Sequence, residues 1–187
     1  MTHMTLLAIV SGIWVLSEQT LMFSRRAGAK SQNRDRGSMM VIWALLVISI
    51  TAGSMLRGFR PTRIPNAPMV FWIGIALILA GIVVRIAAIL TLGRFFTVNV
   101  AIHEGHKVVD RGLYSLVRHP SYSGSLISFL GLGLAFGNWL SVIVILAGAM
   151  IGFLYRIHVE EAALIASLGD DYRKYASRTK RLIPGIY

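Results

Sequence analysis

Residues 120–161 read PSYSGSLISFLGLGLAFGNWLSVIVILAGAMIGFLYRIHVEE and contain two long apolar runs, 120–136 and 139–155. The Gly137-Asn138 dipeptide between the runs is a signal for a tight turn. Neither run alternates between apolar and polar residues, as the strands of an outer-membrane barrel would. Only helices and closed barrels satisfy their backbone hydrogen bonds in lipid, so we predict an antiparallel pair of membrane helices.

Three further apolar runs precede this hairpin, at residues 4–23, 38–56 and 68–92. About 20 residues of helix cross the hydrocarbon core of a bilayer. The 187-residue chain is 55% hydrophobic and only 14% charged, with a mean hydropathy of +0.66, whereas soluble proteins are about 25% charged. The fold class that we expect is therefore an all-α integral membrane protein with five transmembrane helices, of which the last two form the hairpin.

Basic residues are unevenly distributed along the chain, which has 19 Lys and Arg, 8 Asp and Glu and a net charge of +11. They gather in residues 24–37, 93–119 and 156–187, which five spans would place on one side of the membrane. The positive-inside rule then puts the N-terminus outside and the C-terminus in the cytoplasm. Because topology explains the charge, we expect no nucleic-acid partner. The absence of cysteine excludes disulfides and thiolate chemistry.

Two charged residues fall inside the predicted spans, Glu18 in the first and Arg85 in the third. A long basic side chain near the end of a span ordinarily extends to the interface, and Arg85 lies near the cytoplasmic end. The two residues are predicted at similar depths, so an ion pair between them is an alternative. The first span lacks the basic start and the small-residue cleavage site of a signal peptide, so we expect it to remain as a helix.

The polar residues that could form a site lie mainly in the two long cytoplasmic segments. Arg118 and His119 precede Pro120, which fits the first turn of a helix. The free N–H groups and the dipole at a helix N-terminus favour an anion such as a carboxylate. Tyr122 and Gly124 follow within the next turn, and glycine leaves room for a ligand or a neighbouring helix.

The last span continues beyond the membrane into Glu160 and Glu161. Two adjacent carboxylates at a membrane surface are costly unless they meet cations, such as a bound ammonium group or Arg118 across the hairpin. Because the two helices of the hairpin are antiparallel, Arg118 and this acidic pair lie at the same depth. Gly169 then ends the helix, and Asp170 is expected to cap the next one.

Three motifs in this half of the chain occur in a specific order. They are Arg118-His-Pro-x-Tyr-x-Gly124, Glu160-Glu161-x-x-Leu164 and Gly169-x-x-Tyr172-x-x-Tyr175-x-x-Arg178, followed by Pro184. Over residues 92–187 the sequence resembles the isoprenylcysteine carboxyl methyltransferase family. The five spans are similar to those of its short prokaryotic members, and the related phospholipid N-methyltransferases share the Arg-His-Pro-x-Tyr and Glu-Glu parts.

The resemblance implies an enzyme that uses S-adenosylmethionine (SAM) as methyl donor, bound at the cytoplasmic side of a prokaryotic cytoplasmic membrane. It also implies a lipophilic acceptor that comes from the bilayer, by analogy the carboxylate of a prenylcysteine-like substrate, with membrane lipids as the other partners. The chain would form a single membrane domain, 1–187, with three helices in 4–92 and the catalytic part in 93–187. A carboxylate acceptor is ionised at neutral pH, so positioning can supply most of the acceleration.

The resemblance also implies roles for individual residues. His119 and Tyr122 would hold the methionine carboxylate, one of Glu160 and Glu161 would hold the α-ammonium group, and the backbone around 108–114 would line the adenosine. The implied cofactor-binding residues are His106, Val108, Val109, Gly112, Leu113, Tyr114, His119, Tyr122, Glu160 and Tyr172. The implied catalytic residues are Arg118, Glu161 and Arg178, the last as a candidate for binding a carboxylate of the acceptor or the cofactor.

A metal site is a weaker alternative for the same segment. His103 and His106 have the spacing of some metal ligands, but the sequence lacks the further histidine boxes of membrane di-iron enzymes. We therefore expect no metal.

Other functions stay open on the sequence alone. A phospholipid or small-molecule N- or S-methyltransferase, or a membrane reductase that uses NADPH, fits the same scaffold. A non-catalytic membrane scaffold or a transporter subunit is a further alternative. A transporter predicts internal repeats or broken helices at the membrane midplane. The sequence has neither, and its polar residues lie at one face of the membrane instead.

Overall fold

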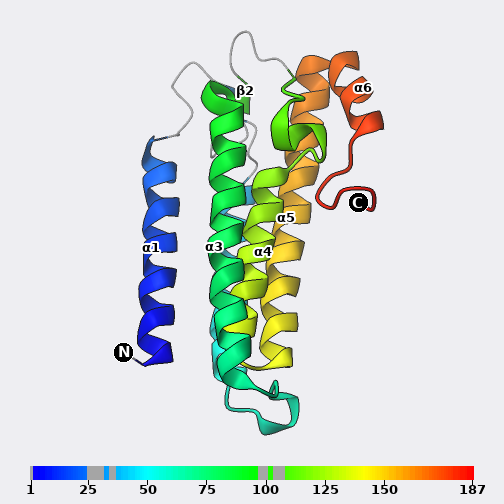
Figure 1. Ribbon diagram of the computed structural model, residues 1–187. Coiled ribbons are helices and arrows are strands. Elements are labelled where there is room, and N and C mark those ends of the chain that lie inside the picture. The colour runs from blue at the N-terminus through cyan, green and yellow to red at the C-terminus, as the bar shows by residue number, and fades with distance from the viewer. Residues whose placement is uncertain (1, 25–31, 34–36, 97–100, 103–107) are drawn as a thin grey trace.

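The computed structural model describes residues 2–24, 32–33, 37–96, 101–102 and 108–187 (Figure 1). The α-helices in these residues are α1 (His3–Ser24), α2 (Ser38–Leu56), α3 (Ala67–Leu92), α4 (Pro120–Ala135), α5 (Trp139–Leu168) and α6 (Asp170–Arg178). Short 3₁₀ helices are η1 (Arg60–Thr62), η2 (Gly93–Phe95) and η3 (Gly112–Ser115). The two-residue strands β1 (Gln32–Asn33) and β2 (Ala101–Ile102) pair antiparallel.

Four of the described helices, α1, α2, α3 and α5, are long and apolar enough to cross a membrane. The predicted helical membrane class is therefore confirmed, apart from the two short strands, which we did not expect. α4 has only 16 residues, so it rises about 24 Å and is shorter than the roughly 30 Å hydrocarbon core. The count of five spans thus stays a prediction. α5, which contains the last predicted span, continues without a break for 30 residues, as expected from its acidic extension.

α3 and α4 approach each other closely because both carry glycine where they meet. A Cβ atom on Gly81 would lie 2.4 Å from the carbonyl oxygen of Gly124 and 2.3 Å from Oγ of Ser128. Further along α3, a Cβ atom on Gly74 would lie 2.6 Å from the carbonyl oxygen of Gly131. Small residues let helix backbones come together in membranes, and here they hold α4 against α3.

α2 packs along α5 in a similar way. A Cβ atom on Gly148 would lie 2.4 Å from Cβ of Ser49, and the hydroxyl of Ser141 donates to the carbonyl oxygen of Gly53 at 2.7 Å. Ile145 of α5 has no exposed surface. The pairs α3–α4 and α2–α5, joined through the α4–α5 hairpin, form the closely packed part of the molecule (Figure 1).

The turn between α4 and α5 is anchored by Asn138. Gly137 has a φ of +68°, and the side-chain oxygen of Asn138 accepts from the backbone nitrogen of Leu140 at 2.9 Å. The side-chain nitrogen of Asn138 donates to the carbonyl oxygen of Phe59 at 2.9 Å. The Thr62 hydroxyl donates to the side-chain oxygen of Asn138 at 2.9 Å. The predicted tight turn is confirmed, and it also fastens the hairpin to the loop between α2 and α3.

α1 is the least covered of the long helices and lies beside α3 (Figure 1). Trp14 is buried, with its ring 4.9 Å from that of Phe129. Near the end of α1, Glu18 forms an ion pair with Arg85 of α3, and 2.5 Å separate Oε1 from Nε. The ion pair between the two spans is therefore confirmed, and Arg85 does not simply extend to the interface.

Replacing Gly81 by alanine should lower the thermal stability of the detergent-purified protein. The added methyl group meets the backbone of α4 at 2.4 Å, and overpacking of this kind costs about 1–3 kcal/mol. Gly12→Ala in α1 is the matched control, since nothing lies within 4 Å of its Cβ position. Thermal unfolding followed by tryptophan fluorescence measures both variants, and equal unfolding temperatures would contradict the close contact between α3 and α4.

Candidate functional site

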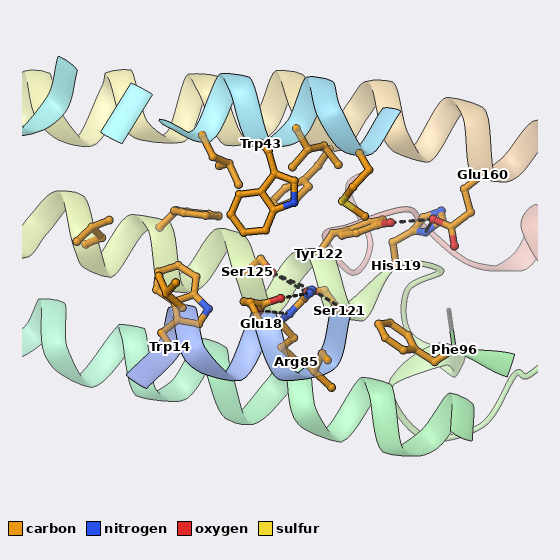
Figure 2. Close-up of a pocket in the computed structure, with 18 of the residues that line it drawn as sticks. Trp14, Glu18, Trp43, Arg85, Phe96, His119, Ser121, Tyr122, Ser125 and Glu160 are labelled. Atoms are coloured by element: carbon orange, nitrogen blue, oxygen red, sulfur yellow. Dashed lines mark hydrogen bonds and ion pairs between the residues drawn. The ribbon is translucent and has the colours of Figure 1, made fainter. Parts of the chain in front are cut away.

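A cavity of about 790 Å³ runs along the inside of the bundle. Its walls come from α1, α2, α3, α4 and α5 and from the segments that follow α3 and α5. One end lies at Arg57 and Phe136, and the other lies at Glu160, Leu168 and Tyr172. Figure 2 shows the central and polar parts of this cavity.

The two ends of the cavity differ in polarity. The residues that line its long apolar part include Leu7, Trp14, Ile42, Trp43, Leu46, Ile50, Phe129 and Leu132. The polar end is lined by His119, Tyr122, Glu160 and Tyr172, together with Val108, Val109 and Tyr114. One cavity therefore connects an apolar channel with a small group of titratable side chains.

The start of α4 positions His119 and Tyr122. Pro120 occupies the first turn, as predicted, and His119 is the residue that precedes it. The ring of Tyr122 stacks between those of His119 and Phe153, at 5.6 and 5.1 Å. The Tyr122 hydroxyl donates to Oε2 of Glu160 at 3.0 Å (Figure 2). The same carboxylate oxygen lies 3.7 Å from Nδ1 of His119, so these three side chains form one connected group.

Glu161 lies beside this group but faces away from the cavity. Its Oε1 accepts from Nε of Arg118 at 2.8 Å and lies 3.4 Å from Nε2 of His119. Its Oε2 accepts from Nε of Arg181 at 3.0 Å. The predicted pairing of Arg118 with the acidic pair is confirmed for Glu161. Of the two adjacent carboxylates, only Glu160 lines the cavity.

The segment after α6 completes the start of α4. The backbone nitrogens of Arg118 and His119 donate to the carbonyl oxygens of Lys180 and Arg181 at 2.7 and 3.0 Å. The Arg118 guanidinium also donates to the carbonyl oxygens of Ala176, at 2.9 Å, and Thr179. This C-terminal segment therefore fixes His119 through its backbone nitrogen and through the backbone and side chain of the neighbouring Arg118.

α6 holds the segment 108–115 against the site. The hydroxyl of Tyr175 donates to the carbonyl oxygen of Tyr114 at 2.7 Å. Burial raises the pKa of Tyr175 to about 12, so the hydroxyl keeps its proton and donates across the physiological pH range. On the surface, Arg178 forms an ion pair with Asp110. Gly169 ends α5 as predicted, but Asp170 is the first residue of α6 and makes no capping bond; it pairs with Arg173 instead.

Tyr172 carries a polar atom that the described residues do not satisfy. Its side chain is 3% exposed and lines the cavity, and its hydroxyl has no hydrogen-bond partner among the described residues. Burial raises the pKa of this hydroxyl well above its usual range, so it remains a neutral donor. A buried donor without a partner is costly, which makes this position suited to a polar ligand.

The structure brings most of the predicted site residues together. Those that line the cavity are Val108, Val109, Tyr114, Arg118, His119, Tyr122, Glu160 and Tyr172. Gly112, Leu113, Glu161 and Arg178 are not among its lining residues, and His106 lies outside the described residues. No group of three or more potential metal ligands occurs in the described part of the chain. His103 and His106, the predicted alternative for a metal site, lie outside the described residues.

Some residues of the site were missed by the sequence reasoning. The hydroxyls of Ser121 and Ser125 accept hydrogen bonds from Nη1 of Arg85 at the cavity wall. Their spacing of one helical turn was the available signal. Arg181 contacts Glu161 because the C-terminal segment pairs through its backbone with the start of α4. No sequence pattern predicts this backbone pairing. Trp43 of α2 lines the apolar part of the cavity. In the sequence it cannot be distinguished from a residue that faces lipid.

Long apolar helices around a cavity with one polar end define a helical integral membrane protein with an internal cavity. A model of the isoprenylcysteine carboxyl methyltransferase family matches residues 72–166, about half of the chain. The chain belongs to this family.

Individual relatives agree with this assignment. The chain is 36% identical over 127 residues to protein-S-isoprenylcysteine O-methyltransferase B of Arabidopsis thaliana, and 34% identical to the A form; both alignments cover 65% of this chain and 64% of the relative. It thus spans less than two thirds of these relatives. A solved structure of the eukaryotic intramembrane Ras methyltransferase of the family is similar with a TM-score of 0.64 and 26% identity, covering 77% of this chain and 52% of the other.

Glu161→Gln should release the C-terminal segment, whereas Glu160→Gln should not. Removing the Glu161 carboxylate leaves Arg118 without its ionic partner in a buried place, and breaking a buried ion pair costs about 3–5 kcal/mol. Limited trypsin digestion, read by mass spectrometry, measures cleavage at the exposed Arg173 and Lys174. If both variants are as resistant as the unchanged protein, Glu161 does not hold this segment.

Proposed function

We propose that the protein is an integral-membrane methyltransferase that transfers a methyl group from SAM to a lipophilic acceptor. By analogy with its relatives, the acceptor group is the carboxylate of a prenylcysteine-like molecule. The observation that carries the proposal is the continuity of the cavity, in which one polar end opens into a long apolar channel. A water-soluble donor and a membrane-borne acceptor require such a junction.

The polar end suits the donor. Glu160 offers a carboxylate for the α-ammonium group, and His119 with Tyr122 offers polar contacts for the methionine carboxylate at the first turn of α4. The buried hydroxyl of Tyr172, which has no partner among the described residues, supplies a further donor. Val108, Val109 and Tyr114 form the wall on which an adenosine would lie. His106 remains part of the proposed donor site on the resemblance alone.

The residues present also suit the chemistry. SAM, when bound, supplies a methyl group on a sulfonium that leaves as a neutral thioether. A carboxylate acceptor is ionised at neutral pH, so no side chain has to remove a proton. The protein then has to hold the two reactants in line and exclude water, and such positioning contributes up to roughly 7–11 kcal/mol.

The apolar part suits the acceptor. Trp14, Trp43 and Phe129 line it along with aliphatic side chains, and each CH₂ group buried there contributes about 0.8 kcal/mol. Because α1 and α2 supply much of this wall, the acceptor would come from the bilayer. The chain would work as one membrane domain in which 93–187 binds the donor and 4–92 shapes the acceptor channel.

Three predicted catalytic residues take positioning roles in this proposal. Arg118 and Glu161 bind each other and the C-terminal segment, and so fix His119. Arg178 pairs with Asp110 on the surface and holds the segment that leads to Val109. None of the three needs to touch the transferred methyl group.

SAM binding is the first experiment. Calorimetric titration of the purified protein with SAM and S-adenosylhomocysteine should give saturable binding. Glu160→Gln should weaken it by about ten- to a hundredfold, since a hydrogen bond to a charged group contributes about 1.5–3 kcal/mol. Tyr172→Phe should weaken it by a smaller factor, and Asp171→Asn, an exposed acid on α6, is the control that should change nothing.

The other outcomes identify the alternatives. Binding of NADPH in place of SAM would favour a reductase. A folded protein that binds neither would favour a non-catalytic membrane protein. Transfer of labelled methyl groups to phospholipid amines, and not to a prenylated carboxylate, would favour an N-methyltransferase on the same scaffold.

We further propose that the protein lies in a prokaryotic cytoplasmic membrane with its N-terminus outside and the polar end of the cavity in the cytoplasm. The exposed basic residues around α6, including Arg173, Lys174 and Lys180, support this orientation under the positive-inside rule. A cytosolic donor would then reach the site directly.

Single cysteines test the orientation because the chain has none of its own. Gly58→Cys lies in the exposed loop after α2, and Ser177→Cys lies on the exposed face of α6. A membrane-impermeant maleimide should label Gly58→Cys on intact bacteria and should label Ser177→Cys only after permeabilisation. The reverse pattern would invert the proposed topology.

A further inference from the structure

The guanidinium of Arg85 is already occupied in the cavity wall. Its Nε and Nη2 lie 2.5 and 2.6 Å from the two carboxylate oxygens of Glu18. Its Nη1 donates to the hydroxyls of Ser121 and Ser125 at 2.7 and 3.1 Å (Figure 2). The contact with Glu18 combines one hydrogen bond from Nη2 with a close ion pair at Nε, and arginine can bind another carboxylate in the same way. Glu18 therefore fills the place that a carboxylate ligand would take.

The other basic side chains on the described cavity wall have partners as well. Arg118 donates to Glu161 at 2.8 Å, and His119 lies 3.4 Å from the same carboxylate. Arg57 lies at the opposite end of the cavity, over the ring of Phe136. An anionic headgroup near the polar end thus meets no unpartnered cation in the described part of the chain. Burying a carboxylate without a cation or hydrogen bonds is costly.

Glu18 has space into which it can move. A second cavity, of about 380 Å³, lies between α1 and α3 and shares Glu18 and Arg85 with the main cavity. Ser17 and Thr20 line it next to Glu18, and their hydroxyls donate to the carbonyl oxygens of Trp14 and Leu16. α1 is also the least covered of the long helices, so few neighbours oppose a change in the position of Glu18.

We propose that Glu18 is a specificity-determining residue that stands in for the acceptor carboxylate on Arg85 and must be displaced by it. The inference rests on the proposed function and names the group that competes with the acceptor. An anionic acceptor moves Glu18 into the second cavity and takes over its hydrogen bonds with Arg85. A neutral acceptor leaves the Glu18–Arg85 pair intact, and its affinity does not depend on this pair.

The exchange keeps Arg85 paired, because one carboxylate replaces another on the same donors, but it leaves Glu18 without its cation, which is costly. The apparent affinity for an anionic acceptor is reduced by the fraction of protein in which Glu18 still occupies Arg85. Removing the carboxylate of Glu18 abolishes this competition for anionic acceptors. The affinity for neutral acceptors does not depend on the competition and should not change.

Binding of N-acetyl-S-farnesylcysteine and of its methyl ester, measured without donor, tests the proposal. Glu18→Gln should bind the free carboxylate about tenfold more tightly than the unchanged protein does, a gain of about 1.4 kcal/mol, and should bind the ester with unchanged affinity. An unchanged or weaker affinity for the carboxylate would overturn the proposal. So would an equal gain for both probes, because that would indicate a wider cavity and not a released cation.

Two further variants keep the test decisive. Glu18→Asp keeps the charge but shortens the side chain, so it should give a smaller gain in the same direction, and it decides the matter if Glu18→Gln does not fold. Asp171→Asn removes one exposed acid elsewhere and should change neither affinity. The assay contains no SAM, so failure of the methyltransferase proposal appears separately, as absent donor binding by the unchanged protein.

Discussion

The polar end of the cavity depends on a single buried carboxylate, that of Glu161. It joins Arg118 at the start of α4 to Arg181 in the C-terminal segment, with His119 beside both. Without this anion, the largely buried guanidinium of Arg118 would lose its ionic partner, and Arg181 its link to the same place. The backbone bonds that hold His119 run to the same segment, so the placement of the cavity-facing residues follows from this contact.

The consecutive residues Glu160 and Glu161 contact different neighbours. Successive side chains on an α-helix point about 100° apart, so Glu160 and Glu161 cannot serve the same neighbour. Glu161 meets the two arginines, while Glu160 turns to the cavity and to Tyr122. One acid of the motif stabilises the first turn of α4, and the other faces the cavity. The sequence alone could not assign these roles, since the rotation of α5 is set by its packing on α2.

The fold was predictable where a local signal decides the structure. Uncharged runs specify the helices, Gly137-Asn138 specifies the turn, and opposite charge specifies the pairs of Glu18 with Arg85 and Arg118 with Glu161. Backbone pairing between the C-terminal segment and the start of α4 leaves no such mark, because every residue has the same backbone groups. The apolar part of the cavity was equally hidden, since Trp43 and its apolar neighbours look the same in the sequence whether they face lipid or a cavity.

The length of α4 explains why a polar site lies inside a membrane protein. α4 has 16 residues and α5 has 30, so α4 begins well below the upper end of its partner (Figure 1). The step that remains is filled by η3 and the C-terminal segment, which carry polar backbone into the bundle and satisfy it there. The first turn of α4 can then present His119 and Tyr122 to a cavity whose other walls are apolar. A longer α4 would lift these groups towards the water and separate them from the channel.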